Sequence, residues 1–175
     1  MERILFMGMP GAGKGTQAAL LKEKGFYILC TGDIIREGFQ NNNSLLKPYQ
    51  EHIDNGGYLQ NEIIFQLIEQ AISKFPEDAK GYILDGAVRT IEQAKFVKKH
   101  SLADKVIFFT LTEEQAEGRL LNRNQGRADD APEAIKNRFI IYKEKTQPML
   151  DYLKENFEFY EVDASPTIGE IHKEV

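Results

Sequence analysis

The chain has 175 residues, of which 42% are hydrophobic and 28% charged, a globular composition rather than that of a disordered or coiled-coil chain. Its apolar runs are too short to span a bilayer, and one cysteine allows neither an internal disulfide nor a multi-thiolate zinc site. A formal net charge of −5 argues against bulk attraction to nucleic acid or to acidic membranes, so any anionic ligand needs locally placed cations.

The start of the chain and its single cysteine indicate a compartment. The opening stretch MERILFMG has no basic region followed by a long apolar run, so we expect no signal peptide. Cys30 ends an apolar run, and we expect it to be a buried, unreactive thiol in a reducing interior. A cytoplasmic protein is therefore expected. Because the sequence has no long apolar heptad pattern, we also expect a monomer.

Short apolar runs alternate with segments of helical periodicity along the whole chain. The runs that read as strands are Arg3–Gly8, Phe26–Cys30, Gly81–Gly86, Lys105–Leu111 and Phe157–Val162. The helical segments are Lys14–Lys24, Asn61–Lys74, Thr90–Lys99, Thr112–Arg123 and Ala131–Asn156. Five strands interleaved with helices predict one compact α/β domain with a parallel sheet. Such sheets bind ligands at the carboxyl ends of their strands.

Three positions predict where helices begin or break. Thr112 before Glu-Glu-Gln and Ser165 before a proline are typical N-terminal caps. Pro148 lies inside the last long helical segment, which we expect it to kink or break.

Four glycines and a lysine lie directly between the first strand and the first helix. They are Gly8, Gly11, Gly13, Gly15 and Lys14. Glycines let successive backbone N–H groups face one anion, and the helix N-terminus adds partial positive charge. The general phosphate-loop pattern, however, has Ser or Thr where this chain has Gly15. The stretch is therefore a damaged nucleotide site, a specialised loop, or a glycine-rich turn with a surface lysine.

The full stretch GMPGAGKGTQ resembles the phosphate loop of adenylate kinases and related nucleoside monophosphate kinases, GxPGxGKGTQ. In that family a small residue follows the lysine and the hydroxyl comes one place later, here Thr16, so the resemblance favours a specialised loop. Further motifs extend it over essentially the whole chain. It implies a P-loop three-layer α/β fold with a five-stranded parallel sheet, formed by one domain over residues 1–175. Within it we expect a nucleoside monophosphate-binding insertion at about 31–60 and a short lid at about 122–132.

The arginines provide an independent check on this resemblance. The lysines are scattered, whereas the seven arginines are concentrated in a few segments, and six of them fall at or beside positions where the family places phosphate-facing arginines. A planar guanidinium grips phosphate oxygens in pairs and stays charged, so it suits a kinase that brings the phosphates of two nucleotides together.

Two motifs resemble the acceptor side of the family. CTGDIIREG resembles TGDxLR, which implies Thr31 near the acceptor base and Arg36 on the acceptor phosphate; alone, Thr-Gly-Asp could be a helix cap made by Asp33. NGGYLQNEI aligns loosely with GKLVPDE, which implies that the backbone of residues 57–59 lines the acceptor nucleoside. A simple surface turn is the alternative there, and whether Tyr58 narrows the pocket or stacks in it is open.

LDGAVRTIEQA resembles the family motif LDGFPRTxxQA. The match implies that Asp85 positions Mg²⁺ through water, although a turn-forming carboxylate is the alternative. It also implies that Arg89 bridges phosphates and Gln93 bonds to the acceptor base. Ala87 and Val88 replace Phe and Pro, which leaves open how precisely Arg89 is held.

GRLLNRNQGRADDAPEAIKNR resembles the lid of the short-lid members. Arg119 and Arg123 are four residues apart, so on one helix they would share a face and converge on one phosphate chain. Arg127 and Arg138 would close over the transferred group. Asp129 and Asp130 either pair with these arginines or cap the next helix. The segment has no cysteine cluster, so we expect no structural zinc.

The residues implied by the resemblance fall into three sets. The catalytic set is Lys14, Asp85, Arg89, Arg123, Arg127 and Arg138. The ATP-binding set is Gly11, Ala12, Gly13, Lys14, Gly15, Thr16, Arg119, Arg123 and, through its backbone at the adenine, Pro166. The AMP-binding set is Thr31, Arg36, Gly57, Tyr58, Leu59, Gly86, Arg89, Gln93, Arg127 and Arg138.

The implied activity is reversible phosphoryl transfer from MgATP to AMP, giving two ADP, with Mg²⁺ as the only metal. Thr31, Thr90 and Gln93 fit the adenylate kinase pattern, whereas relatives that act on UMP or CMP typically have Ala and Asn at the first two positions. Three alternatives remain: a UMP/CMP kinase, a nucleotide-binding module with weakened transfer activity, and an interaction domain that uses the glycine loop only as a turn. The expected partners are the small nucleotides ATP and AMP, and neither nucleic acid nor a membrane is expected.

Overall fold

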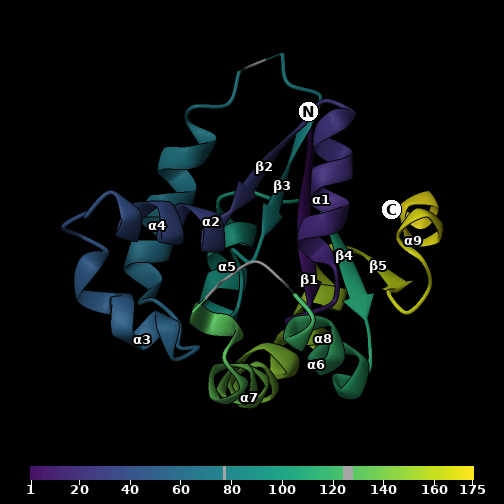
Figure 1. The fold of residues 1–175 in the computed structure, drawn as a ribbon. Coiled ribbons are helices and arrows are strands. Elements are labelled where there is room, and N and C mark those ends of the chain that lie inside the picture. Colours follow the sequence, from purple (N-terminus) through teal and green to yellow (C-terminus); the bar gives the residue numbers. More distant parts are fainter. Residues whose placement is uncertain (77, 124–127) are drawn as a thin grey trace.

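The computed structural model describes residues 1–76, 78–123 and 128–175. Its five strands form one parallel sheet in the order β2-β3-β1-β4-β5 (Figure 1). Their bounds are β1 Glu2–Gly8, β2 Phe26–Cys30, β3 Gly81–Asp85, β4 Lys105–Thr110 and β5 Glu158–Asp163. The helices are α1 Lys14–Glu23, α2 Thr31–Gln40, α3 Gln50–Asp54, α4 Asn61–Ile72, α5 Ile91–Lys99, α6 Glu113–Leu121, α7 Pro132–Ile141, α8 Leu150–Asn156 and α9 Ile168–Glu174. The predicted α/β fold with a five-stranded parallel sheet is confirmed.

Two apolar layers enclose the sheet, because successive side chains of a strand point to opposite faces. In β1, Leu5 and Met7 pack in one cluster, which also contains residues of α4, α5 and α8. Ile4 and Phe6 pack in the other cluster, with residues of α1 and α9. The sheet is therefore the middle layer of three, and the central strand β1 is buried on both faces, as its continuous apolar run predicts.

The order of the strands decides where a ligand can bind. β1 lies between β3 and β4, so the connections that leave β1 and β3 diverge at the carboxyl end of the sheet. A parallel sheet binds ligands at such a switch point. The loop of residues 9–13 leaves the sheet there, and α6 and α7 lie beyond the same edge (Figure 1).

The predicted helix starts gave one success and one error. Thr112 caps α6 through a capping box with Gln115, as expected. The prediction for Ser165 is wrong: α9 begins at Ile168, and Thr167 is its cap. The amide and hydroxyl of Ser165 donate instead to the Asp163 carboxylate, 2.8 and 2.9 Å away, which closes a turn before the helix begins.

The long helical segment predicted over 131–156 is divided. α7 is followed by a π-helical turn at Tyr142–Thr146 and a 3₁₀ turn at Gln147–Met149, and α8 completes the segment. Pro148 lies in the 3₁₀ turn, so the predicted break is confirmed, because proline cannot donate the helical hydrogen bond. Helices α2 and α3 were not predicted from periodicity. Among the described residues, none of the helices has the length and apolarity needed to cross a membrane.

Candidate functional site

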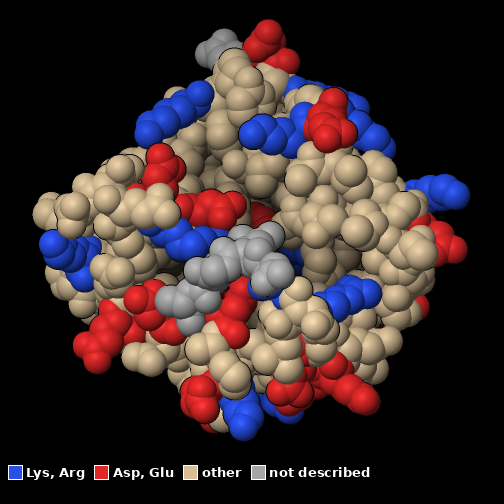
Figure 2. Space-filling view, in the orientation of Figure 1, with Lys and Arg blue, Asp and Glu red and all other residues tan. Residues whose placement is uncertain are grey.

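Two cavities open at the carboxyl end of the sheet. The first, of about 470 Å³, lies between α2, α3 and the start of α4, and the second, of about 870 Å³, lies over the glycine loop. Arg36, Tyr58, Arg89 and Arg138 line both of them. Figure 2 shows this face hollowed near its centre, with basic and acidic side chains gathered beside the hollow. The two cavities therefore meet at a group of three arginines.

The glycine loop is held by close backbone contacts. A Cβ at Gly8 would lie 2.6 Å from the Phe109 carbonyl oxygen, and one at Gly11 would lie 2.6 Å from the Ala116 carbonyl oxygen. Both residues also have positive φ angles, +139° and +87°, which side chains disfavour. These glycines are thus required by the fold of the loop.

Lys14, the first residue of α1, folds back across this loop. Its Nζ donates to the carbonyl oxygens of Gly8 and Met9 at 2.8 and 2.9 Å. Burial lowers the pKa of Lys14 to about 8; nearby Asp85 opposes this shift and Arg89 adds to it. The ammonium group therefore lies in a partly desolvated, positively charged region, where an anion would be bound strongly.

Position 15, where the general pattern has a hydroxyl, lies beside the end of β3. A Cβ at Gly15 would be 3.6 Å from Oδ2 of Asp85, which is an ordinary contact distance. Steric exclusion is therefore not the reason for this glycine. Thr16 follows on the exposed side of α1 and lines the second cavity.

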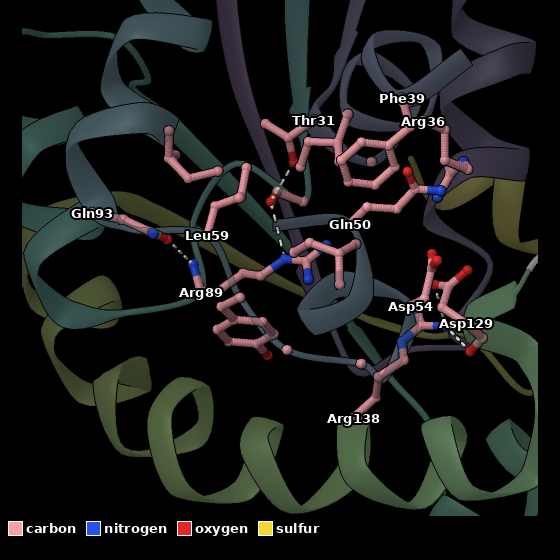
Figure 3. Close-up of a pocket in the computed structure, with 18 of the residues that line it drawn as sticks. Thr31, Arg36, Phe39, Gln50, Asp54, Leu59, Arg89, Gln93, Asp129 and Arg138 are labelled. Carbon is pink, nitrogen blue, oxygen red and sulfur yellow. Dashed lines mark hydrogen bonds and ion pairs between the residues drawn. The ribbon is translucent and has the colours of Figure 1, made fainter. Parts of the chain in front are cut away.

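Arg89 is held at four points. Its backbone N–H donates to Oε1 of Gln93 at 2.7 Å, and its carbonyl accepts from the Thr146 hydroxyl at 2.9 Å. Its Nε donates to the Gly86 carbonyl oxygen at 3.2 Å. The guanidinium carbon lies 4.8 Å from the centre of the Tyr58 ring. Main chain and side chain are thus both fixed where the cavities meet (Figure 3).

The inner end of the first cavity combines apolar walls with two buried polar side chains. Leu59 and Ile64 supply apolar surface, and Thr31 and Gln93 are only 1% and 2% exposed. The Thr31 hydroxyl donates to the Gly86 carbonyl oxygen at 2.7 Å. Asp33 is not the cap of α2, because the helix already begins at Thr31.

Asn61 was not recognised from the sequence. Its Oδ1 accepts from Nε2 of Gln93 at 2.9 Å and from the Thr90 hydroxyl at 3.3 Å. Asn61 and the backbone N–H of Arg89 together fix the orientation of the Gln93 side-chain amide, with Nε2 toward Asn61 and Oε1 toward Arg89. Residues 61 and 93 lie on different helices, so spacing in the sequence carries no signal of this contact.

The segment expected to form the lid contains a cluster of ion pairs. Arg138 lies 2.9 Å from Asp129 and 3.5 Å from Asp130, and Arg123 lies 3.6 Å from Asp130. Burial lowers the pKa of Arg138, which Asp129 opposes. Of the two roles considered for the aspartates, the structure shows pairing with arginines; α7 is capped by Ala131 without a side-chain bond. Arg127 lies outside the described residues.

Arg119 and Arg123 do not share a helical face. α6 ends at Leu121, so Arg123 lies beyond the helix and turns to Asp130. Arg119 donates instead to the Ala164 carbonyl oxygen at 2.8 Å, in the turn that contains Pro166. A Cβ at Gly13 would be 4.0 Å from Nη1 of Arg119, so this guanidinium lies beside the glycine loop.

The residues expected on the basis of the resemblance divide between the cavities. Those that line the first are Thr31, Arg36, Gly57, Tyr58, Leu59, Gly86, Arg89, Gln93 and Arg138. Those that line the second are Gly11, Gly13, Lys14, Gly15, Thr16, Asp85 and Arg123, again with Arg36, Tyr58, Gly86, Arg89 and Arg138. Ala12, Arg119 and Pro166 line neither; Ala12 is 1% exposed and packs in the core.

Comparison with known proteins identifies the family. The family model described as adenylate kinase matches residues 6–158 of the chain. The chain belongs to the adenylate kinase family. It is 38% identical to the adenylate kinase of Leptospira biflexa over an alignment of 162 positions, which covers 88% of this chain and 87% of that protein. The adenylate kinase of Mycolicibacterium paratuberculosis is 36% identical over 175 residues, covering 97% of this chain and 94% of the relative. The adenylate kinase of Phocaeicola vulgatus is 34% identical, and the alignment covers the whole of this chain and 96% of that protein.

Family membership agrees with the specialised form of the glycine loop. The matched region begins in β1, before Gly8, and continues to the start of β5. The phosphate-loop context that the sequence predicted, a strand followed by the loop and by a helix N-terminus at Lys14, is present in the structure. The loop of this family member is therefore not a chance cluster of glycines.

Proposed function

We propose that the protein catalyses reversible transfer of the γ-phosphoryl group of MgATP to AMP, giving two ADP. The observation that carries this proposal is the meeting of the two cavities at Arg36, Arg89 and Arg138. One cavity contains a phosphate loop, and the other has a polar inner end suited to a base. Two nucleotides bound there would present their phosphates to the same cations.

In this reaction an oxygen of the acceptor phosphate attacks the γ-phosphorus, and the bond to the bridging β,γ-oxygen breaks. No side-chain nucleophile is required, so catalysis consists of positioning and neutralisation of charge. Lys14 and the loop N–H groups would hold the donor phosphates. Arg36 and Arg89 would hold the acceptor phosphate.

The lid arginines would act at the transferred group. Arg123 and Arg138, with Arg127, would bind its oxygens and exclude water, which otherwise hydrolyses ATP. Arg119 beside Gly13, Ala12 within the loop and the backbone at Pro166 would complete the donor site. The ion pairs with Asp129 and Asp130 keep Arg123 and Arg138 beside the second cavity.

The residues at the end of β3 and the start of α1 fit a magnesium site. Asp85 is 6% exposed and lines the second cavity together with Thr16. Mg²⁺ typically keeps several waters and takes one or two carboxylates plus substrate phosphates, so one carboxylate and one hydroxyl suffice. When bound, the ion would neutralise charge on the donor phosphates. We propose that Asp85 orients its waters.

The fixed Gln93 amide supports adenine as the acceptor base. After its bonds to the Arg89 amide and to Asn61, one N–H and one lone pair remain. Because both partners fix the orientation, the amide offers a donor and an acceptor in a set order. Adenine matches this pair, because its ring nitrogen N1 accepts a hydrogen bond and its amino group donates one.

The proposal also covers the subdomains of the molecule, its oligomeric state and its location in the cell. Residues 31–60, from α2 through α3, would form the acceptor-binding insertion, and residues 122–132 the lid of a single domain over 1–175. The net charge of −5 and the absence of a heptad pattern support a monomer that binds small nucleotides, not nucleic acid or membrane. A cytoplasmic location is proposed from the sequence features alone.

A panel of acceptors with MgATP tests the function. AMP, CMP and UMP are compared side by side in an assay that detects ADP, and AMP is expected to be the best acceptor. A higher rate with CMP or UMP would make the protein a pyrimidine nucleotide kinase. Tight ATP binding without AMP-dependent ADP formation would make it a nucleotide-binding module.

Two arginine substitutions test the site. Arg89→Ala and Arg123→Ala should each lower the rate by about 10²-fold or more, the usual effect of losing one transition-state donor. Arg3→Ala is the control, because Arg3 pairs with Asp104 at the opposite end of β1 and lines neither cavity. Wild-type rates in both site variants would refute the assignment.

A further inference from the structure

Position 58 differs from the family motif quoted above, which has leucine where this chain has Tyr58. The Tyr58 ring packs against Arg89, with 4.8 Å between the ring centre and the guanidinium carbon. The Tyr58 hydroxyl lies 3.4 Å from Oγ1 of Thr146, and the same hydroxyl of Thr146 donates to the Arg89 carbonyl oxygen at 2.9 Å. Tyr58 therefore reaches Arg89 both directly and through Thr146.

The backbone of Tyr58 is itself held by the side chain of His52. Nε2 of His52 lies 3.0 Å from the Tyr58 carbonyl oxygen. A Cβ at Gly57 would lie 2.3 Å from the same Nε2, so only glycine lets the His52 ring pack there. Gly57, which replaces a lysine of the family motif, thus makes room for the histidine that fixes the Tyr58 backbone.

The same chain departs from the motif directly before Arg89. Val88 stands where the motif has proline, and its backbone lacks the fixed φ angle that proline imposes. Ala87 and Val88 are buried, at 0% and 2% exposure, so they pack in the core without gripping the guanidinium. The proline that would fix the main chain before Arg89 is thus absent, and the contacts with Gln93, Gly86, Thr146 and Tyr58 hold this arginine instead.

We propose that Tyr58 is a positioning residue that orders Arg89 for the acceptor phosphate and takes over the role that proline plays before this arginine in the motif. A cation–π contact uses the face of the guanidinium and leaves its N–H edges for phosphate oxygens. The inference rests on the proposed function, because it assigns Arg89 to the acceptor phosphate. It also gives the acceptor-binding insertion, to which Tyr58 belongs, a direct effect on the rate.

Kinetics of two Tyr58 variants test the role of the ring. Tyr58→Leu should lower kcat roughly 3- to 30-fold, the range of one cation–π contact, with little change in the KM for ATP. Tyr58→Phe keeps the ring over Arg89 and should recover most of this loss. Wild-type kcat in Tyr58→Leu, or an equal loss in Tyr58→Phe, would overturn the role of the ring.

The compensation is tested in a second background. In Val88→Pro, the additional loss caused by Tyr58→Leu should shrink to within about twofold, because contacts that serve one group are not additive. An equal loss in both backgrounds would show that Tyr58 does not replace the proline.

A nuclear magnetic resonance measurement separates this inference from the proposed function. The Nε–Hε order parameter of Arg89, assigned by its loss in Arg89→Lys, should be high in the wild-type chain and fall below about 0.6 in Tyr58→Leu. An unchanged order parameter would overturn the positioning role. If the wild-type chain formed no ADP from ATP and AMP, the proposed function would fail, and this measurement would still decide whether Tyr58 orders Arg89.

Discussion

Lys14 is bonded to the loop that it follows, and its charge depends on pH near neutrality. The two carbonyl oxygens that accept from Nζ belong to Gly8 and Met9, at the start of the loop. A triphosphate bound in the loop would offer stronger acceptors and would stabilise the ammonium form. The pKa of Lys14 should therefore rise from about 8 when ATP binds.

This linkage predicts weaker ATP binding at alkaline pH. Below pH 8 most of the free protein carries the ammonium form that binds ATP; above pH 8 that fraction falls about tenfold per unit. The Kd for MgATP should rise about tenfold between pH 7 and pH 9, with uptake of protons on binding at pH 9. Calorimetry in buffers of different ionisation enthalpy measures both quantities. Lys14→Arg is the control, since its charge is constant, and a slope as steep in that variant would contradict the role of Lys14.

At the residue scale the sequence predicted the position of the charged groups better than that of their partners. A motif specifies Lys14, Asp85 and Arg89, and all three line the second cavity. Asn61 and Thr146 were not, because each acts on a residue far away in the chain, Gln93 or Arg89. Hydrogen bonds of this kind depend on which helices pack together, and a single sequence does not specify that packing.

At the scale of single elements, helix starts were predictable where the cap is part of a local pattern. Thr112 has Gln115 three residues later, and both bonds of the capping box form. Ser165 also has a hydroxyl and a following proline. Its amide and hydroxyl, however, donate to the carboxylate of Asp163 two residues earlier. Local competition for the same hydroxyl therefore decides which residue caps the helix.

A pair of alanine substitutions tests this difference. Thr112→Ala should lower the free energy of unfolding by about 1 kcal/mol, because the α6 N-terminus loses a partner. Ser165→Ala should lower it by less than about 0.5 kcal/mol, since its hydroxyl serves an exposed turn. Urea unfolding of both variants gives the values. A larger loss for Ser165→Ala would restore that residue as a cap.

At the scale of the whole molecule, the parallel sheet and its layers followed from the apolar runs, but the strand order did not. Continuous burial of β1 and β3 predicts central strands, whereas their neighbours depend on long connections. The contact between the proposed acceptor-binding insertion and α7 could not be predicted from the sequence either. It depends on Gly56, where a Cβ would lie 2.8 Å from the Ala134 carbonyl oxygen and 2.9 Å from Cγ of Arg138.

This docking predicts a specific effect of Gly56→Ala. The φ of Gly56 is +84°, so alanine adds backbone strain and also collides with α7. Gly25→Ala is a matched control, because its φ is +92° but a Cβ there would meet nothing within 4 Å. In both variants the strained backbone should lower the free energy of unfolding by about 1 kcal/mol or more. Thermal unfolding measures this loss.

Only Gly56→Ala should also raise the KM for AMP, by roughly tenfold, because the collision moves the insertion away from Arg138 and widens the cavity that both line. The KM for ATP should change little in either variant, since the glycine loop lies on the other side of the arginines. An equal change in the two KM values would mean that α7 and the insertion do not act together. An unchanged KM for AMP would mean that the insertion needs no support from α7 to bind its nucleotide.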